Sequence, residues 1–151
     1  MATLFKGQKL MRKVGTEYQE VNAEEVLKNK VVGLYFSAHW CPPCRMFTPI
    51  LKEFYGELTG EQFEIVFVSF DRSDKDLKVY LQEAHGDWCF LPFGSDFIQT
   101  LSKKYDVSGI PAFLIIKPNG DCIEKNARNA VQNPNDAPTV TLSNWKTAAG
   151  I

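Results

Sequence analysis

The chain has 151 residues, of which 44% are hydrophobic, enough to build one substantial core. Its 17 lysines and arginines balance 18 aspartates and glutamates along the chain, which argues against a nucleic-acid partner or an anionic membrane surface. The N-terminus lacks the apolar core of a secretory signal, and no apolar run approaches the roughly 20 residues that cross a bilayer. We therefore expect a single domain over residues 1–151, located in the cytoplasm with the nucleus as a second location.

The first half of the chain predicts a strand-helix-strand unit. Weaker patterns precede it and predict a strand over residues 4–11 and a helix over residues 23–28. Residues 31–36 and 63–70 are rich in β-branched and aromatic side chains, which is typical of strands that are buried on both faces of a sheet. Between them, apolar residues recur at three- and four-residue spacing and predict a helix that begins within Cys41-Pro42-Pro43-Cys44; its buried stripe is Phe47, Ile50, Leu51, Phe54 and Leu58.

The second half predicts two more helices and a hairpin. Ser73 and Asp76 resemble a capping box, followed by the apolar face of a helix, and a third helix is expected between Phe97 and Tyr105. Pro118-Asn119-Gly120 predicts the turn of an antiparallel hairpin. Together these elements indicate an α/β fold with a central mixed β-sheet flanked by helices and a C-terminal antiparallel hairpin.

The end of the chain gives weaker patterns. For residues 129–151 we expect a short irregular tail with a helical piece over residues 142–147. Within this tail, Trp145 is either part of a docking segment or an aromatic residue packed against the core. The residues alone leave both interpretations open.

The spacing of Cys41 and Cys44 predicts a redox-active dithiol. Two intervening residues place the sulfurs one helical turn apart, close enough to form a disulfide. Unpaired N–H groups in the first turn stabilise a thiolate at Cys41, while Pro42 and Pro43 fit there because no intrahelical donor is needed. We expect Cys41 to attack a substrate disulfide and Cys44 to resolve the mixed disulfide, with no cofactor and no metal.

The other cysteines and the histidines leave alternatives open. The dithiol could be half of a zinc site completed by two of Cys89, Cys122, His39 and His85, but these four residues lack the close spacing of a second ligand pair. We expect Cys89 and Cys122 to be small buried core residues, with a redox or regulatory role as the alternative. His39 either raises the thiolate fraction by its charge or is a loop histidine with no catalytic part.

The segment Tyr-Phe-Ser-Ala-His-Trp-Cys-Pro-Pro-Cys-Arg at residues 35–45, followed by Phe47-Thr48-Pro49, closely resembles the tryparedoxin and nucleoredoxin branch of the thioredoxin superfamily. The likeness extends over roughly residues 30–120. It implies a thioredoxin fold, with Pro49 accommodated as a helix kink. One departure from ordinary thioredoxins is Tyr35, which replaces a buried acidic residue six positions before the nucleophile and leaves the proton acceptor for Cys44 unidentified.

The resemblance also implies a substrate-binding surface beside the dithiol. Pro111 is expected to take the cis form, although an isolated X–Pro bond is usually trans, and to expose the Ile110 backbone to an extended substrate. Trp40, Pro42 and Ile110 are expected to form an apolar platform, and the substrate-binding residues are therefore Trp40, Pro42, Pro43, Ile110 and Pro111.

Two functions follow from these expectations. The first is a monomeric protein-disulfide reductase that acts on disulfide-containing proteins, including an oxidised peroxidase of the peroxiredoxin type, and is recharged by an upstream thiol reductant. The second is a redox-sensitive regulator of the nucleoredoxin type, in which the dithiol gates the binding of a partner and does not turn over.

Overall fold

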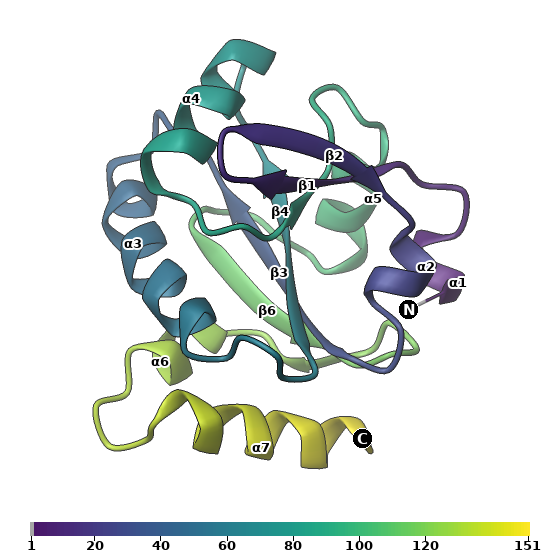
Figure 1. The fold of residues 1–151 in the computed structure, drawn as a ribbon, viewed down its shortest axis with the longest axis vertical. Helices are drawn as coiled ribbons and strands as arrows, with labels where there is room; N and C mark the ends of the chain where they lie inside the picture. Colours follow the sequence, from purple (N-terminus) through teal and green to yellow (C-terminus); the bar gives the residue numbers. More distant parts are fainter. Residues whose placement is uncertain (1) are drawn as a thin grey trace.

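The computed structural model describes residues 2–151, and a seven-stranded mixed sheet lies at its centre (Figure 1). The strand order is β2-β1-β5-β4-β3-β6-β7. The strands are β1 (Leu10–Val14), β2 (Glu17–Val21), β3 (Val31–Ser37), β4 (Phe63–Ser69), β5 (Cys89–Phe90), β6 (Ala112–Ile116) and β7 (Cys122–Glu124). β4 runs parallel to β3 and β5, whereas all the other neighbouring pairs are antiparallel. The predicted mixed sheet and C-terminal hairpin are confirmed.

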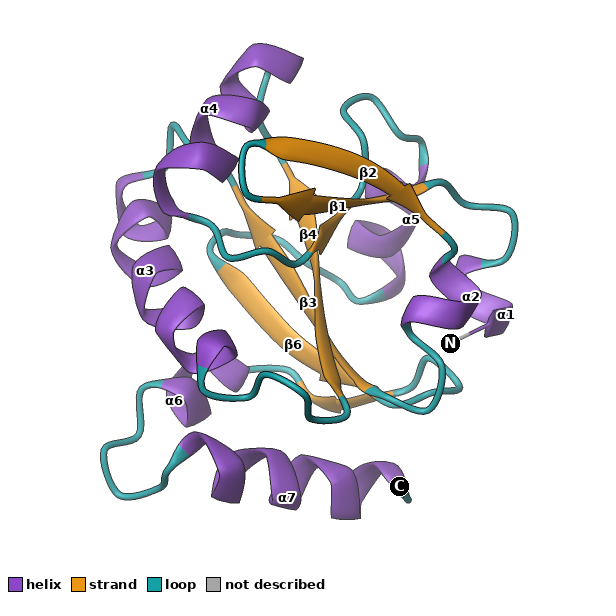
Figure 2. Cartoon of the chain, in the orientation of Figure 1, coloured by secondary structure: helices purple, strands orange, loops and turns teal. Residues whose placement is uncertain are grey.

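Helices cover both faces of the sheet (Figure 2). They are α1 (Ala2–Phe5), α2 (Ala23–Val26), α3 (Pro42–Gly56), α4 (Asp74–Ala84), α5 (Phe97–Lys104), α6 (Ala127–Val131) and α7 (Pro138–Ala149). Because side chains alternate along a strand, Val31 and Tyr35 of β3 pack with residues of α3, α4 and α7, while Val32 and Leu34 pack with residues of α1, α2 and α5.

The burial of the central strands explains why their sequence segments are nearly continuously apolar. All seven residues of β3 and all seven of β4 are buried, as expected for parallel strands covered on both faces. Close packing between β3 and β6 requires a glycine: a Cβ built on Gly33 would lie 2.5 Å from the Phe113 ring. This packing fixes the position of β3, whose C-terminal end leads directly into the dithiol.

Two expectations about the ends of the chain are wrong. The strand predicted over residues 4–11 is the short helix α1 followed by β1, which starts at Leu10 and pairs with the unpredicted strand β2. Residues 129–151 are not an irregular tail, because α6 ends at Val131 and α7 is a regular twelve-residue helix. The helical piece expected over residues 142–147 is confirmed as part of α7. Trp145 of α7 is 4% exposed and contacts the rings of Phe54 and Phe63. The packed interpretation of Trp145 therefore holds.

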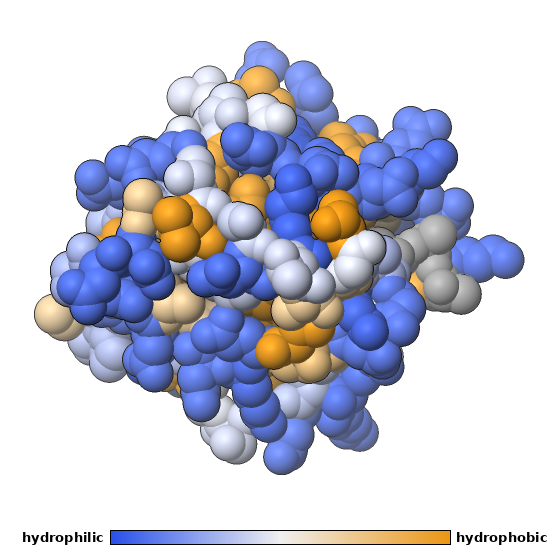
Figure 3. Space-filling model, turned by 90° about the horizontal axis from the view of Figure 1, so that it is seen from below, coloured by the Kyte–Doolittle hydropathy of each residue, from blue (hydrophilic) through white to orange (hydrophobic). Residues whose placement is uncertain are grey.

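The surface on the side of α7 is mostly hydrophilic, with apolar residues in small separate groups (Figure 3). Within residues 2–151, no helix combines the length and the apolar character required to cross a membrane.

Candidate redox site

The dithiol lies where β3 passes into α3. Cys41 is the N-cap of α3 in an extended conformation, and Pro42 and Pro43 occupy its first turn, so the helix starts as the sequence predicts. The Cys44 N–H donates to the Cys41 sulfur over 3.4 Å. Both cysteines are free thiols, with Cys41 5% exposed and Cys44 fully buried. One sulfur thus reaches the surface at the positive end of a helix, while the second lies behind it.

Trp40 lies beside the dithiol with 47% of its surface exposed. Its indole N–H donates to the Phe70 carbonyl over 3.0 Å, and the Arg72 guanidinium lies 4.9 Å from its ring centroid. Pro42 and Pro43 are exposed as well. The exposed ring of Trp40 and the two exposed prolines therefore flank Cys41 in the chain.

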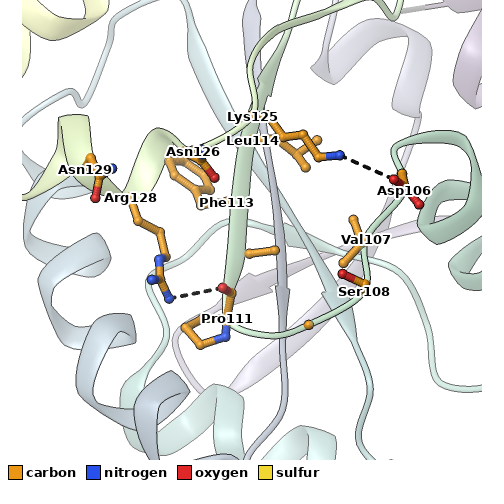
Figure 4. A pocket seen from close by; sticks show the side chains of 12 residues that line it. Asp106, Val107, Ser108, Pro111, Phe113, Leu114, Lys125, Asn126, Arg128 and Asn129 are labelled. Atoms are coloured by element: carbon orange, nitrogen blue, oxygen red, sulfur yellow. Dashed lines mark hydrogen bonds and ion pairs between the residues drawn. The ribbon is translucent and has the colours of Figure 1, made fainter.

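The Ile110–Pro111 peptide bond is cis, as the resemblance implied. The Ile110 carbonyl oxygen lies 3.9 Å from the Cys41 sulfur, and the Ile110 side chain packs against the two cysteines. Arg128 of α6 donates to the Pro111 carbonyl over 3.1 Å (Figure 4). Both residues line a cavity of about 240 Å³. All five expected substrate-binding residues therefore lie close to the dithiol or next to a residue that contacts it.

A buried carboxylate, which the sequence analysis missed, holds the loop before the dithiol. Asp71 accepts a hydrogen bond from the His39 backbone N–H over 2.7 Å and another from the Ser69 hydroxyl over 2.6 Å. Asp71 follows the end of the buried strand β4 by two residues. This position could have identified it from the sequence, since polar groups that face a ligand often follow such strands. Arg128 offered no signal of this kind because it lies in α6, a short helix that no sequence pattern predicted.

Cys44 is surrounded by hydroxyl groups. Burial, reinforced by the neighbouring Cys41, raises the pKa of Cys44 to about 11, while a hydrogen bond with Ser37 acts in the opposite direction. Tyr35, which stands in place of the acidic residue of ordinary thioredoxins, has its hydroxyl 3.4 Å from the Cys44 carbonyl oxygen and 2.6 Å from the Thr48 hydroxyl.

The remaining cysteines and His39 make contacts outside the dithiol pair. Cys89 is fully buried, as expected, but Cys122 is exposed because β7 lies at the edge of the sheet, so the expectation for Cys122 is wrong. The Nε2 atom of His39 lies 2.8 Å from a carboxylate oxygen of Glu83, within hydrogen-bond distance. Over residues 2–151, no three histidine, cysteine or acidic side chains gather into a metal-binding group, so the zinc alternative has no ligand set there.

Comparisons with known proteins agree with this geometry. Residues 29–122 match a family model described as thioredoxin-like. The chain is 34% identical to human nucleoredoxin-like protein 1 over 162 aligned positions that include 100% of this chain and 74% of that protein. Its structure is similar to thioredoxin from Wuchereria bancrofti, with 52% identity, a TM-score of 0.78 and 94% and 96% of the two chains covered. It is also similar to tryparedoxin I from Leishmania major, with 34% identity, a TM-score of 0.72 and 85% and 87% covered.

The matched residues contain both cysteines of the dithiol and the cis-proline beside them. The chain belongs to the thioredoxin-like family, within the nucleoredoxin and tryparedoxin branch, whose members are generally oxidoreductases.

Proposed function

We propose that this protein reduces disulfides in other proteins, with Cys41 as the nucleophile and Cys44 as the resolving thiol. The observation that carries the proposal is the cap of α3, where the Cys44 N–H donates to the Cys41 sulfur at the surface end of the helix. A sulfur anion in this position is stabilised by the unpaired N–H groups and the dipole of the helix. Cys44 lies one turn further on, within reach of the same sulfur.

The surroundings of Cys41 support an extended protein chain as the substrate. The Ile110 carbonyl beside the sulfur and the cis bond that follows it offer backbone hydrogen bonding to a chain that runs past the dithiol. Trp40, Pro42 and Pro43 offer apolar contacts around that chain.

The reaction proceeds in two exchanges. The Cys41 thiolate attacks one sulfur of the substrate disulfide, and the other substrate sulfur leaves as a thiolate. Cys44 then attacks the Cys41 sulfur, the second substrate thiol is released, and the protein is left with a Cys41–Cys44 disulfide. An upstream thiol reductant returns this disulfide to the dithiol.

Reduction of insulin by dithiothreitol, followed by turbidity, tests the proposal. Wild type is expected to accelerate precipitation of the insulin B chain, and Cys41→Ser is expected to give the uncatalysed rate. Cys122→Ser is the matched control, because it removes an exposed thiol on β7 and leaves the dithiol intact. Equal rates for wild type and Cys41→Ser would contradict the proposal.

A second variant tests the order of the two thiols. Cys44→Ser lacks the resolving sulfur, so it should accumulate mixed disulfides through Cys41 that mass spectrometry of the linked peptides locates. Linkage through Cys122 instead of Cys41 would contradict the assigned roles.

A further inference from the structure

Four hydroxyl groups form a connected cluster behind the dithiol. The Tyr35 hydroxyl lies 2.6 Å from that of Thr48, the Thr48 hydroxyl 2.5 Å from that of Tyr80, and the Tyr80 hydroxyl 2.6 Å from that of Ser37. The cluster bonds to Cys44 through its carbonyl oxygen, which accepts from Thr48 over 2.9 Å and from Tyr35 over 3.4 Å. Ser37 also acts on the Cys44 thiol and lowers its pKa, against the effect of burial. We refer to these four side chains, Tyr35, Thr48, Tyr80 and Ser37, as the hydroxyl chain.

Three elements bring the hydroxyl chain together. Tyr35 and Ser37 are two residues apart on β3 and therefore point to the same face of the sheet. Thr48 lies one helical turn after Cys44 on α3, and Tyr80 comes from the buried face of α4. All four residues are fully buried, so their hydroxyl groups depend on one another for hydrogen bonds.

Each hydroxyl has a single proton, so the direction in which the cluster donates can change with the state of Cys44. When Cys44 is a thiol, the donors can run from its sulfur through Ser37 and Tyr80 to Thr48, which donates to the Cys44 carbonyl over 2.9 Å. When Cys44 is a thiolate, the direction can reverse, so that Tyr35 donates to Thr48 and each following hydroxyl donates onward to the sulfur. In the second arrangement Ser37 donates to the anion.

The resolving step requires a deprotonated Cys44. Cys44 must lose its proton to attack the mixed disulfide, yet it is fully buried, and burial disfavours a thiolate. Titratable groups face it from three elements: Cys41 on α3, Tyr35 on β3 and Tyr80 on α4. The rings of His39 and His85 also contact the Tyr80 ring. The members of the cluster carry hydroxyl groups and no carboxylate.

We propose that the hydroxyl chain stabilises the Cys44 thiolate in the resolving step by donating a hydrogen bond to it. The inference rests on the proposed dithiol function and adds the group that makes its second exchange possible. Ser37 acts on the reacting sulfur directly and is the catalytic member. Tyr80, Thr48 and Tyr35 are positioning residues that orient the Ser37 proton toward the sulfur.

The step balances without an added acid or base. The Cys44 sulfur donates an electron pair to the Cys41 sulfur, the bond between Cys41 and the substrate sulfur breaks, and the Cys41–Cys44 bond forms. The proton lost by Cys44 passes to the solvent. The substrate sulfur leaves with its electron pair and takes up one proton from the solvent, so the number of protons is conserved. The four hydroxyl groups change the direction of their hydrogen bonds and keep their own protons.

Reaction of the reduced protein with 5,5′-dithiobis(2-nitrobenzoate) separates the two exchanges. Attack by Cys41 releases the first thionitrobenzoate, and resolution by Cys44 releases the second, so stopped-flow absorbance gives both rates. The experiment uses the Cys122→Ser background because Cys122 is the exposed thiol that would add a third signal, while Cys89 is fully buried. Rates are measured from pH 5 to pH 10.

Ser37→Ala and Tyr80→Phe are expected to slow the second release about tenfold at neutral pH, the effect of one lost hydrogen bond to a charged group, and to move its pH profile upward by about one unit. The first release should keep its rate, which also shows that the variants are folded. Thr48→Val should behave in the same way, with Thr48→Ser restoring the rate. Tyr55→Phe is the control, since it removes the hydroxyl of a partly buried tyrosine that is bonded to Glu64 and lies outside the hydroxyl chain.

The outcomes separate this inference from the proposed function. An unchanged second release in both Ser37→Ala and Tyr80→Phe would overturn the role of the hydroxyl chain while leaving the dithiol mechanism in place. The role of the hydroxyl chain would also be overturned if a variant slowed the first and second releases equally. The same holds if Tyr55→Phe slowed the second release as much as Tyr80→Phe; either result would indicate a structural effect. If the unmutated chain released only one thionitrobenzoate, the resolving role of Cys44, and with it the proposed function, would fail.

Discussion

Trp145→Ala is expected to destabilise the protein strongly, although it lies near the end of the chain. The side chain is 4% exposed, its ring centroid lies 5.7 Å and 5.8 Å from those of Phe54 and Phe63, and its indole N–H donates to Glu124. A buried tryptophan removes about 150–250 Å² from water, worth about 4–6 kcal/mol as an upper bound. Truncation should therefore lower the free energy of unfolding by about 3–5 kcal/mol and the Tm by about 6–20 °C.

Trp40→Ala is the matched control, because the same truncation at a half-exposed residue removes little packing. It should cost less than about 1.5 kcal/mol, the scale of the hydrogen bond to Phe70 that it loses. Urea unfolding followed by far-UV circular dichroism measures both variants without relying on tryptophan fluorescence. In the insulin assay the two variants should rank the other way: Trp40→Ala should lose activity, while Trp145→Ala that is still folded should keep it. A loss below about 1 kcal/mol for Trp145→Ala would refute the assignment of α7 to the core.

Three further predictions concern the core and the thiols. Burial lowers the pKa of His85 well below its ordinary value of 6.5. Below pH 6.5 the unfolded chain therefore takes up a proton that the folded protein excludes. As the pH decreases from 6.5, the free energy of unfolding should decrease by up to about 1.4 kcal/mol per pH unit. Urea unfolding between pH 5 and pH 8 measures this, and His85→Phe should reduce the slope. Gly33→Ala should lower the free energy of unfolding by about 1–3 kcal/mol, because its Cβ meets the Phe113 ring. Iodoacetamide should label Cys122 in the native protein and Cys89 only after unfolding, as peptide mass spectrometry would detect.

Each of these has a clear opposing result. An identical pH dependence in wild type and His85→Phe would mean that the buried imidazole does not govern acid stability. Wild-type stability in Gly33→Ala would mean that the contact between β3 and β6 is looser than the structure indicates. Native labelling of Cys89 would contradict its burial, and a lack of native labelling at Cys122 would contradict its exposed position on β7.

The sequence alone determined the features that depend on local chemistry. Helix α3 starts at the dithiol because Pro42 and Pro43 suit a first turn and apolar residues follow at helical spacing. The central strands were evident because a strand buried on both faces must be apolar throughout. The Ser73 cap also formed as predicted, with its hydroxyl accepting from the Asp76 N–H. The cis bond before Pro111 came from the family resemblance.

Only the tertiary structure decided which distant residues meet. Weakly patterned β2 and two-residue β5 gave no local signal. Only residues 142–147 of α7 were expected to be helical, because the core that α7 covers comes from other elements. Asp71 reaches the loop before the dithiol through a contact between residues 32 positions apart. The hydroxyl chain likewise draws its members from β3, α3 and α4. Hydrogen bonds between such segments depend on how the sheet and helices pack, and hydropathy periodicity carries no information about that packing.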